Sequence, residues 1–282
     1  MAGTLHIVAT PLGNLDDLSR RARDTLAGSA LVACEDTRRT AKLLAHCGLD
    51  VPLLAIHKFS ERDRLDSVLE VLARGDDVAL VSDGGTPGVS DPGALLVAAA
   101  HDAGITVSPV PGPSALVAIL SAAGLPGDRF VFEGFLPARA GERRNRLREL
   151  AGETRTVVLY EAPHRIKASL SDMAEVWGER TIVLGRELTK VYEVILRGSA
   201  RDVLLRLGDG DVKGEIAIAV AGYDGSSSTG LGKDDPIETL WAEALAAARG
   251  DTRAALKAAA KALGIKKPEL WRRLAERGLV RD

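Results

Sequence analysis

The fold is constrained most by residues 78–100, where a glycine-rich segment separates two apolar segments. The apolar residues Val78–Val81 are followed by four glycines and two prolines within residues 82–93, and then by the apolar segment Ala94–Ala100. This order is typical of a buried strand, a tight turn and a helix. Glycine lets backbone N–H groups approach a ligand, and Asp83 would lie at the carboxyl end of the strand, where open α/β sheets bind their ligands. The run therefore predicts a ligand-binding loop rather than an ordinary connection, with Ser90 capping the helix.

Strands and helices alternate in the same way throughout residues 1–124. Five short apolar runs each precede a helical segment, which predicts a mostly parallel sheet with helices on both faces. The expected strands are Leu5–Thr10, Ala30–Cys34, Leu53–Ile56, Val78–Val81 and Ile105–Val110. These residues are predicted to form an N-terminal α/β domain that carries the ligand loops.

The pattern changes after residues 124–127, where two glycines and a proline mark a boundary. Residues 125–222 are predicted to form a second α/β domain with a mixed sheet, because two of their strands lie close enough in sequence to pair antiparallel. Residues 223–235 are rich in Gly, Ser and Asp, which predicts a flexible linker. Residues 236–282 contain three short helical segments and are predicted to form a small basic helical domain.

Composition is that of an ordinary soluble globular protein, with 46% hydrophobic and 27% charged residues. Only 4% of the residues are aromatic, which argues against base stacking as the main binding device. The two cysteines, Cys34 and Cys47, lack metal-ligand spacing and are expected to be reduced thiols, so no metal site is predicted. No signal peptide and no apolar run of membrane-spanning length is present, and we therefore expect a cytoplasmic protein.

Charge is distributed unevenly along the chain. From Pro236 onward there are ten Lys/Arg and six Asp/Glu residues, a net charge of +4 that leaves −6 on the rest of a chain whose total is −2. A basic tail on an acidic body is typical of a protein with a polyanionic partner, but a solvated helical face explains the same charges equally well.

Three Gly/Pro turns fall at the carboxyl ends of predicted strands: Thr10–Asn14, residues 82–93 and Pro111–Ser114. Because the carboxyl ends of parallel strands share one edge of the sheet, these turns are expected to converge into a ligand cleft. None of them matches the dinucleotide fingerprint or the phosphate-binding P-loop, so the ligand is not expected to be held through a pyrophosphate. A cofactor with a carboxylate, an amine and an adenosine would suit open backbone edges beside Asp83.

Two acids and two arginines follow the second predicted strand. Glu35 and Asp36 can act as a general base, and Arg38 and Arg39 can bind an anion. The same residues also fit a capped helix start with exposed arginines. The two interpretations are nearly balanced, and the position at a strand end favours the functional one. His57 and His164 each follow a predicted strand, but a lone histidine is more often structural or merely exposed.

The run Arg139–Arg148 holds five arginines and overlaps a helix predicted over Gly141–Leu150. Phosphate contact with RNA is one interpretation, and a solvated helix face is the other.

Six motifs together resemble one known family. They are Thr-Pro-Leu-Gly-Asn-Leu (10–15), Glu-Asp-Thr-Arg (35–38), the glycine-rich loop (82–93), Pro-Gly-Pro-Ser-Ala (111–115), Tyr-Glu-Ala-Pro-His-Arg (160–165) and Gly-Arg-Glu-Leu-Thr-Lys (185–190). In this order they closely resemble the bacterial ribosomal RNA small-subunit methyltransferase I family, which is similar in fold to the tetrapyrrole methylases. The resemblance covers Leu5 to Gly222, and the C-terminal helices are similar to that family's small terminal domain.

The resemblance implies a tetrapyrrole methylase-like fold and S-adenosylmethionine-dependent 2′-O-methylation of a cytidine in the decoding region of 16S rRNA. It also implies a homodimer that acts on 16S rRNA or the small ribosomal subunit, with the cofactor in a cleft between the two α/β domains. The residues implied to bind the cofactor are Pro11, Gly13, Asp83, Gly84, Gly85, Thr86, Val89, Pro111, Gly112, Ser114 and Ala115.

A ribose 2′-OH is a poor nucleophile at neutral pH, so a positioned base is expected to remove its proton. The candidates for that base are Glu35, Asp36 and His57. The residues expected to contact RNA are Arg38, Arg39, Arg143, Arg144, His164, Arg165, Lys266 and Lys267.

Three other functions compete with this hypothesis. A tetrapyrrole methyltransferase would have no need of Glu-Asp-Thr-Arg, the arginine-rich helix or the basic tail. A non-catalytic RNA-binding or ribosome-assembly module would have no need of a cofactor cleft. A nucleotide-dependent dehydrogenase is disfavoured because the dinucleotide fingerprint is missing.

Overall fold

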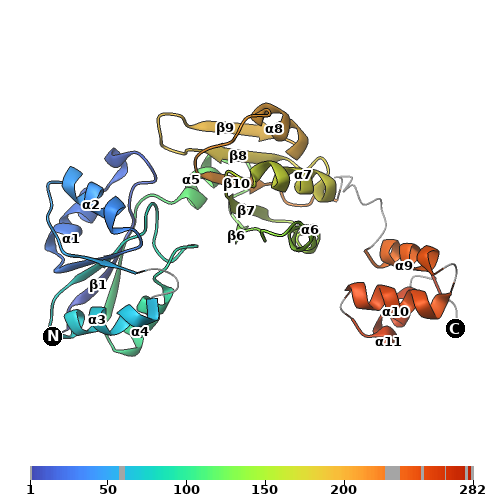
Figure 1. Cartoon of the computed structure of the whole chain (residues 1–282), viewed down its shortest axis with the longest axis horizontal. Coiled ribbons are helices and arrows are strands. Elements are labelled where there is room, and N and C mark those ends of the chain that lie inside the picture. Colours follow the sequence, from blue (N-terminus) through green and yellow to red (C-terminus); the bar gives the residue numbers. More distant parts are fainter. Residues whose placement is uncertain are drawn as a thin grey trace. The chain divides into compact units, whose positions relative to one another are not determined.

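The chain forms two compact units, Met1–Ser227 and Ser228–Asp282, in a computed structural model (Figure 1). The structure describes residues 2–56, 61–225, 236–248, 251–263, 265–276 and 279–280. His57, one of the predicted catalytic residues, lies outside these described residues, as does most of the predicted linker. The first unit holds two five-stranded sheets, and the second unit is helical.

The first sheet is entirely parallel, with strand order β3-β2-β4-β1-β5. Its strands are β1 (Thr4–Val8), β2 (Leu31–Cys34), β3 (Leu53–Ala55), β4 (Val78–Leu80) and β5 (Thr106–Val110). Its helices are α1 (Arg20–Gly28), α2 (Thr37–His46), α3 (Glu61–Ala73) and α4 (Ala94–Asp102). The parallel sheet predicted from the alternating pattern is therefore confirmed.

Each face of this sheet has its own apolar core, because successive strand residues point to opposite faces. Leu5 and Leu80 pack with Leu72 of α3 and Leu96 of α4 on one face. Val8, Val32 and Ala79 pack with Leu26 of α1 and Leu44 of α2 on the other. Burial on both sides explains why the strands are continuously apolar in sequence.

The second sheet is mixed, with strand order β6-β7-β10-β8-β9. Its strands are β6 (Phe130–Phe135), β7 (Thr156–Glu161), β8 (Ile182–Arg186), β9 (Val194–Gly198) and β10 (Ile216–Val220). Only β6 and β7 pair in parallel, and the predicted antiparallel pairing of β8 with β9 is confirmed. One face is covered by α6 (Ala140–Glu149), α7 (Ile166–Trp177) and α8 (Ala200–Leu207) around the fully buried Trp177.

Helix α5 (Ala115–Ala123) covers the opposite face of this second sheet, although it follows β5 of the first (Figure 1). Its Ile119 packs against Val158, Val183 and Ala217. The chain therefore crosses from one sheet to the other at Pro111–Ser114, before α5, and not after residue 124 where the sequence pattern changes.

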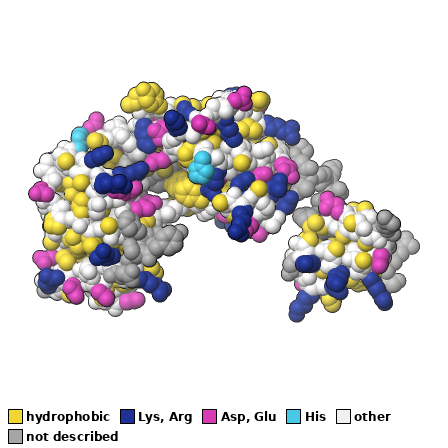
Figure 2. Space-filling view, viewed as in Figure 1, with side chains coloured by type: hydrophobic (Ala, Val, Ile, Leu, Met, Phe, Trp, Pro, Cys, Tyr) yellow, Lys and Arg dark blue, Asp and Glu magenta, His cyan; other side chains and the backbone are white. Residues whose placement is uncertain are grey.

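The second unit contains α9 (Pro236–Ala247), α10 (Thr252–Leu263) and α11 (Lys267–Glu276) around a small core that includes Trp241, Ala259 and Leu270. Arg253, Lys257 and Lys261 recur at four-residue spacing on the exposed side of α10, so they form one basic stripe. Figure 2 shows Lys and Arg side chains projecting together from one edge of this unit. Among the described helices, none is long and apolar enough to cross a membrane.

Candidate functional site

The three Gly/Pro turns meet at one edge of the first sheet, as the sequence predicts. Thr10 and Gly85 exchange two backbone hydrogen bonds of 2.9 Å, and the Thr86 hydroxyl donates to the Pro113 carbonyl at 3.1 Å. Two glycines permit this approach. A Cβ at Gly84 would lie 3.2 Å from the Pro11 carbonyl oxygen, and Gly85 has a φ of +93°, which side chains disfavour.

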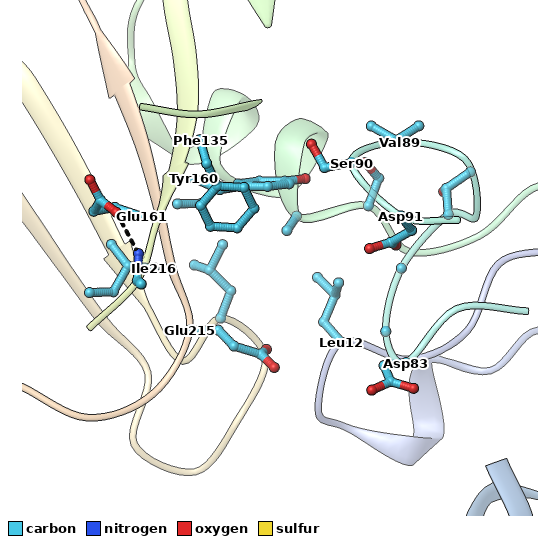
Figure 3. Close-up of a pocket in the computed structure, with 18 of the residues that line it drawn as sticks. Leu12, Asp83, Val89, Ser90, Asp91, Phe135, Tyr160, Glu161, Glu215 and Ile216 are labelled. Carbon is cyan, nitrogen blue, oxygen red and sulfur yellow. Dashed lines mark hydrogen bonds between the residues drawn. The ribbon is translucent and has the colours of Figure 1, made fainter. Parts of the chain in front are cut away.

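A cavity of about 360 Å³ opens between these turns and the strand ends of the second sheet (Figure 3). Its volume lies in the range of small-molecule sites, which is roughly 300–1,000 Å³. The first half of the chain contributes Leu12, the glycine-rich loop and the start of α5. The second half contributes residues at the ends of β6 and β7 and at the start of β10, among them Phe135, Tyr160, Glu161, Glu215 and Ile216.

Seven of the eleven residues expected to bind a cofactor line this cavity. They are Asp83, Gly84, Gly85, Thr86, Val89, Ser114 and Ala115. Pro11 and Gly13 instead line a smaller neighbouring cavity of about 220 Å³, which shares Leu12 and Asp83 with the first. Pro111 and Gly112 line neither of these two cavities, and a Cβ at Gly112 would lie 3.1 Å from the Ala9 Cβ, so this glycine permits close packing on β1.

The cavity residues from the second half of the chain could not be assigned individually from the sequence, and neither could Leu12, Ser90 and Asp91. The motif Tyr-Glu-Ala-Pro-His at the end of β7 could have indicated four of them, because its first four residues, 160–163, line the cavity. Tyr160 is held by edge contacts with the rings of Phe132 and Phe135, and its hydroxyl accepts a hydrogen bond from the Leu116 N–H at 3.0 Å. Tyr160 therefore fixes the start of α5 against the second sheet.

Three of the four carboxylates in the cavity already have cationic partners. The buried Glu161 pairs with Arg165 at 2.6 Å and accepts the Ala162 N–H at 2.8 Å. Glu215 pairs with Lys190 at 3.2 Å. Asp83 lies 3.4 Å from Arg39 and also accepts the Asp36 N–H at 3.0 Å. Their charges are thus partly balanced, and their orientations are fixed.

The fourth carboxylate, Asp91, is half-buried, and burial is the main reason that its pKa is raised to about 6. It follows Ser90, which has a φ of +67° and does not cap α4 as the sequence suggested. Gly93 holds the cap position, and the Glu61 carboxylate of α3 accepts the Gly93 and Leu96 N–H groups at 3.2 and 3.0 Å. Glu61, which is distant in sequence, therefore caps α4 in place of Ser90. Ser90 and Asp91 are not used in the cap and line the cavity.

Asp36 begins α2, as the structural interpretation of this motif predicts. Its carboxylate accepts the Arg38 N–H at 2.8 Å and pairs with the Arg38 guanidinium at 2.8 Å. The hydrogen bonds from Arg38 hold the pKa of Asp36 well below its usual range. Glu35 is half-buried beside it, and its charge helps to raise the pKa of Asp91 in the cavity.

The residues expected to contact RNA are not equally available. The Arg38 and Arg39 side chains, in the first turn of α2, are 87% and 59% exposed. Arg144 is partly exposed beside Asp172 and Glu175, and His164 is exposed. Arg165 is committed to Glu161, and the exposed Lys266 and Lys267 belong to the second unit.

The prediction that Arg143 contacts RNA is wrong. This residue is 4% exposed, and its guanidinium contacts the Asp172 carboxylate at 2.6 and 2.7 Å and the Ala138 carbonyl at 3.1 Å. The arginine-rich helix turns Arg143 toward α7, so this side chain ties two helices together and is not accessible to phosphate.

Replacing Arg143 by alanine is expected to lower the free energy of unfolding by about 3–5 kcal/mol, because Asp172 would remain buried without its closest partner. Arg148→Ala on the same helix is the matched control and should change stability by less than about 0.5 kcal/mol, since Arg148 is exposed. Urea titration of both variants measures the difference. Equal stabilities would contradict the structural role of Arg143.

The motif Gly-Arg-Glu-Leu-Thr-Lys forms a strained turn that contacts the first Gly/Pro turn. Glu187 and Thr189 have φ values of +54° and +68°, and Lys190 pairs with Glu187 at 2.8 Å. The Thr189 hydroxyl accepts the Asn14 N–H at 3.3 Å. A Cβ at Gly13 would lie only 2.1 Å from the Lys190 Cγ, so the lysine stem occupies the space beside this glycine.

Gly13→Ala is expected to destabilise the protein by about 1–3 kcal/mol, because the added methyl overpacks against Lys190. In a Lys190→Ala background the same change should cost at least about 1 kcal/mol less, which identifies the contact by a double-mutant cycle. Gly152→Ala is the control, since a Cβ there meets nothing within 4 Å. The test is thermal unfolding of the wild type, the two single variants and the double variant. If the two changes in stability simply add, the Gly13–Lys190 contact is refuted.

No cluster of three or more metal-ligating side chains occurs among the residues that the structure describes. The chain belongs to the family of tetrapyrrole (corrin/porphyrin) methylases, whose sequence profile matches residues 4–204. A solved uroporphyrin-III-C-methyltransferase from Thermus thermophilus has a TM-score of 0.53 and 21% identity, covering 79% of this chain and 93% of that one. The methyltransferase CobJ has a TM-score of 0.59 and 22% identity, covering 78% and 95%. These two similarities show the fold.

Within that fold class, the chain belongs to the ribosomal RNA small subunit methyltransferase I family, as its motifs indicate. The member from Pseudomonas aeruginosa is 45% identical over 282 residues, which cover 98% of each chain. The member from Xylella fastidiosa strain Temecula1 is 52% identical over 223 residues, 78% of this chain and 82% of the relative. The member from Escherichia coli O157:H7 is 42% identical and covers 96% and 94%.

Proposed function

We propose that this protein transfers a methyl group from S-adenosylmethionine to the 2′-OH of a cytidine in the decoding region of 16S rRNA. One observation supports this most: residues from three Gly/Pro turns and from the strand ends of a second sheet line a common cavity of about 360 Å³. The name shared by the curated relatives, ribosomal RNA small subunit methyltransferase I, supports the class of substrate.

The side chains of the cavity fit a methyl donor of this kind. Asp83 and Glu215 supply negative charge for a sulfonium and an amine, and Leu12, Val89 and Ile216 supply apolar contacts for a nucleoside. A uroporphyrin-III C-methyltransferase from Thermus thermophilus solved in complex with S-adenyl homocysteine has the same fold, with a TM-score of 0.56 and 18% identity. When bound, the donor would supply an electrophilic methyl group.

Pro11, Gly13, Pro111 and Gly112 would shape the turns rather than contact the cofactor directly. The site would orient the 2′-oxygen, the methyl carbon and the sulfur in line, since positioning is the main requirement of this displacement.

The sequence suggests Glu35, Asp36 or His57 as the base, but neither Glu35 nor Asp36 lines the cavity. Asp36 is a poor proton acceptor, because Arg38 holds the pKa of its carboxylate low. Its proposed part is to orient Arg38 toward a phosphate near the target ribose.

RNA would be bound by Arg38, Arg39 and His164 near the cavity, by Arg165 next to His164, and by Arg144 on α6. Lys266 and Lys267 of the second unit would add phosphate contacts. The homodimer and the cytoplasmic location implied by the resemblance and the composition belong to this proposal as well.

A methylation assay with purified small ribosomal subunits and methyl-labelled cofactor tests the proposal, followed by mapping of the modified nucleotide. We expect label on the ribose of one cytidine of 16S rRNA. Label on a tetrapyrrole precursor instead would favour the alternative methyltransferase, and cofactor binding without any transfer would favour a binding module.

A further inference from the structure

We propose that Asp91 is the catalytic base that removes the proton from the attacking hydroxyl. This inference rests on the proposed function, because it concerns the transfer of a methyl group to a 2′-OH. Asp91 belongs to the glycine-rich loop, and neither the motif comparison nor the helix-start motif singled it out.

Asp91 occupies a central position in the cavity. In Figure 3 its carboxylate points away from its own loop and into the space between Leu12, Tyr160 and Glu215. The backbone turns sharply just before Asp91, where Gly88 and Ser90 have positive φ values of +79° and +67°. A non-glycine residue in this backbone region is strained, and such strain is typical of functional loops.

The other carboxylates of the cavity are poorly suited to accept a proton. Glu161 is bound by Arg165, Glu215 by Lys190, and Asp83 by Arg39. In the described part of the chain, no lysine or arginine forms an ion pair with Asp91. Apart from a hydrogen bond with the Ser82 hydroxyl, its carboxylate therefore keeps lone pairs available to a hydroxyl group of the substrate.

The surroundings give Asp91 a proton affinity suited to the task. Burial raises its pKa to about 6, the negative charges of Glu35, Asp83 and Glu215 act in the same direction, and the Ser82 hydroxyl lowers it. Tyr160, which faces it from β7, stays a neutral phenol because burial and then the charge of Asp91 raise its pKa. A base is most effective when its pKa lies near the working pH, and at pH 7 to 8 Asp91 is ionised.

In the proposed step, the 2′-oxygen forms a bond to the methyl carbon. The bond from that carbon to sulfur breaks and leaves its electron pair on sulfur. The 2′-OH proton passes to an Asp91 carboxylate oxygen and from there to solvent. The products are a 2′-O-methyl ribose, a neutral thioether and a proton.

Asp91→Asn tests this role because the amide keeps the shape but cannot accept the proton. With small ribosomal subunits as substrate, kcat should fall by about 100-fold or more, while the cofactor Kd measured by calorimetry changes by less than about threefold. Asp91→Glu should recover part of kcat. Asp66→Asn, an exposed acid on α3, is the matched control and should behave as wild type.

Two readouts do not depend on the size of kcat. Wild-type kcat should fall as the pH drops through about 6, and this limb should be absent from Asp91→Asn. Because the pKa of Asp91 is raised in the folded state, its ionisation lowers stability as the pH rises from about 4 to about 6, and the loss persists at pH 8. Asp91→Asn should therefore melt at the same or a higher temperature at pH 8.

An unchanged kcat in Asp91→Asn would overturn the assignment while leaving the methyltransferase proposal intact. A loss of cofactor affinity equal to the loss of kcat would also overturn it, since Asp91 would then be a cofactor ligand. Failure of the wild-type protein to label any 16S ribose would instead overturn the proposed function, and the Asp91 inference with it.

Discussion

Ala115→Trp is expected to remove binding of the methyl donor, with a loss of at least about 100-fold in affinity. Ala115 is the first residue of α5 and lines the cavity. Because Ile119 of the same helix is fully buried against the second sheet, α5 cannot shift easily to admit a larger ring. The indole would therefore occupy space that the cofactor needs, and a 100-fold loss corresponds to about 2.7 kcal/mol of binding free energy.

Calorimetric titration of S-adenosylmethionine into both proteins measures this loss. Val117→Trp is the control, because Val117 lies on the same helix but is 56% exposed and does not line the cavity. Both variants should unfold at temperatures close to that of the wild type. Wild-type affinity in Ala115→Trp would mean that the donor binds outside this cavity.

Reversing the charge of the stripe on α10 is expected to weaken RNA binding by about two orders of magnitude near 0.1 M salt. The variant carries glutamate in place of Arg253, Lys257 and Lys261, three exposed residues with four-residue spacing. If each contacts one phosphate, the slope of log affinity against log salt should become shallower by roughly 3. Cofactor affinity should not change, because the cavity lies wholly within the first unit.

Filter binding of 16S rRNA over a range of salt concentrations measures both quantities. The control places glutamate at Arg20, Arg64 and Arg74, three exposed residues of the first unit, and so changes the net charge equally. A similar loss in both variants would indicate that only the total charge matters. Unchanged binding in the α10 variant would show that the tail is a solvated helical unit without a role in RNA binding.

The element order of the first sheet could be predicted because buried parallel strands are apolar throughout and Gly or Pro residues punctuate them. The convergence of the three turns followed from the same topology, since the carboxyl ends of parallel strands share an edge. Asp83, Thr86 and Ser114 could therefore be placed in the cavity from sequence.

Features that depend on distant residues could not be predicted. Glu61 caps α4 from 32 positions upstream of Gly93, so the local cap expected at Ser90 is not used. Arg143 looks like its exposed neighbours in sequence, and only the position of Asp172 on α7 shows that it is buried. Asp91 is one acid in a loop, and its raised pKa comes first from burial and then from charges that include Glu35 and Glu215 on two other segments.

A crystal structure of this protein with S-adenosylhomocysteine tests the central claim most directly. We predict density for the ligand between the glycine-rich loop, the start of α5 and the ends of β7 and β10, with Asp91 facing the sulfur from the side open to substrate. Density at another surface, or side chains closing this cavity while the ligand is bound elsewhere, would contradict the account.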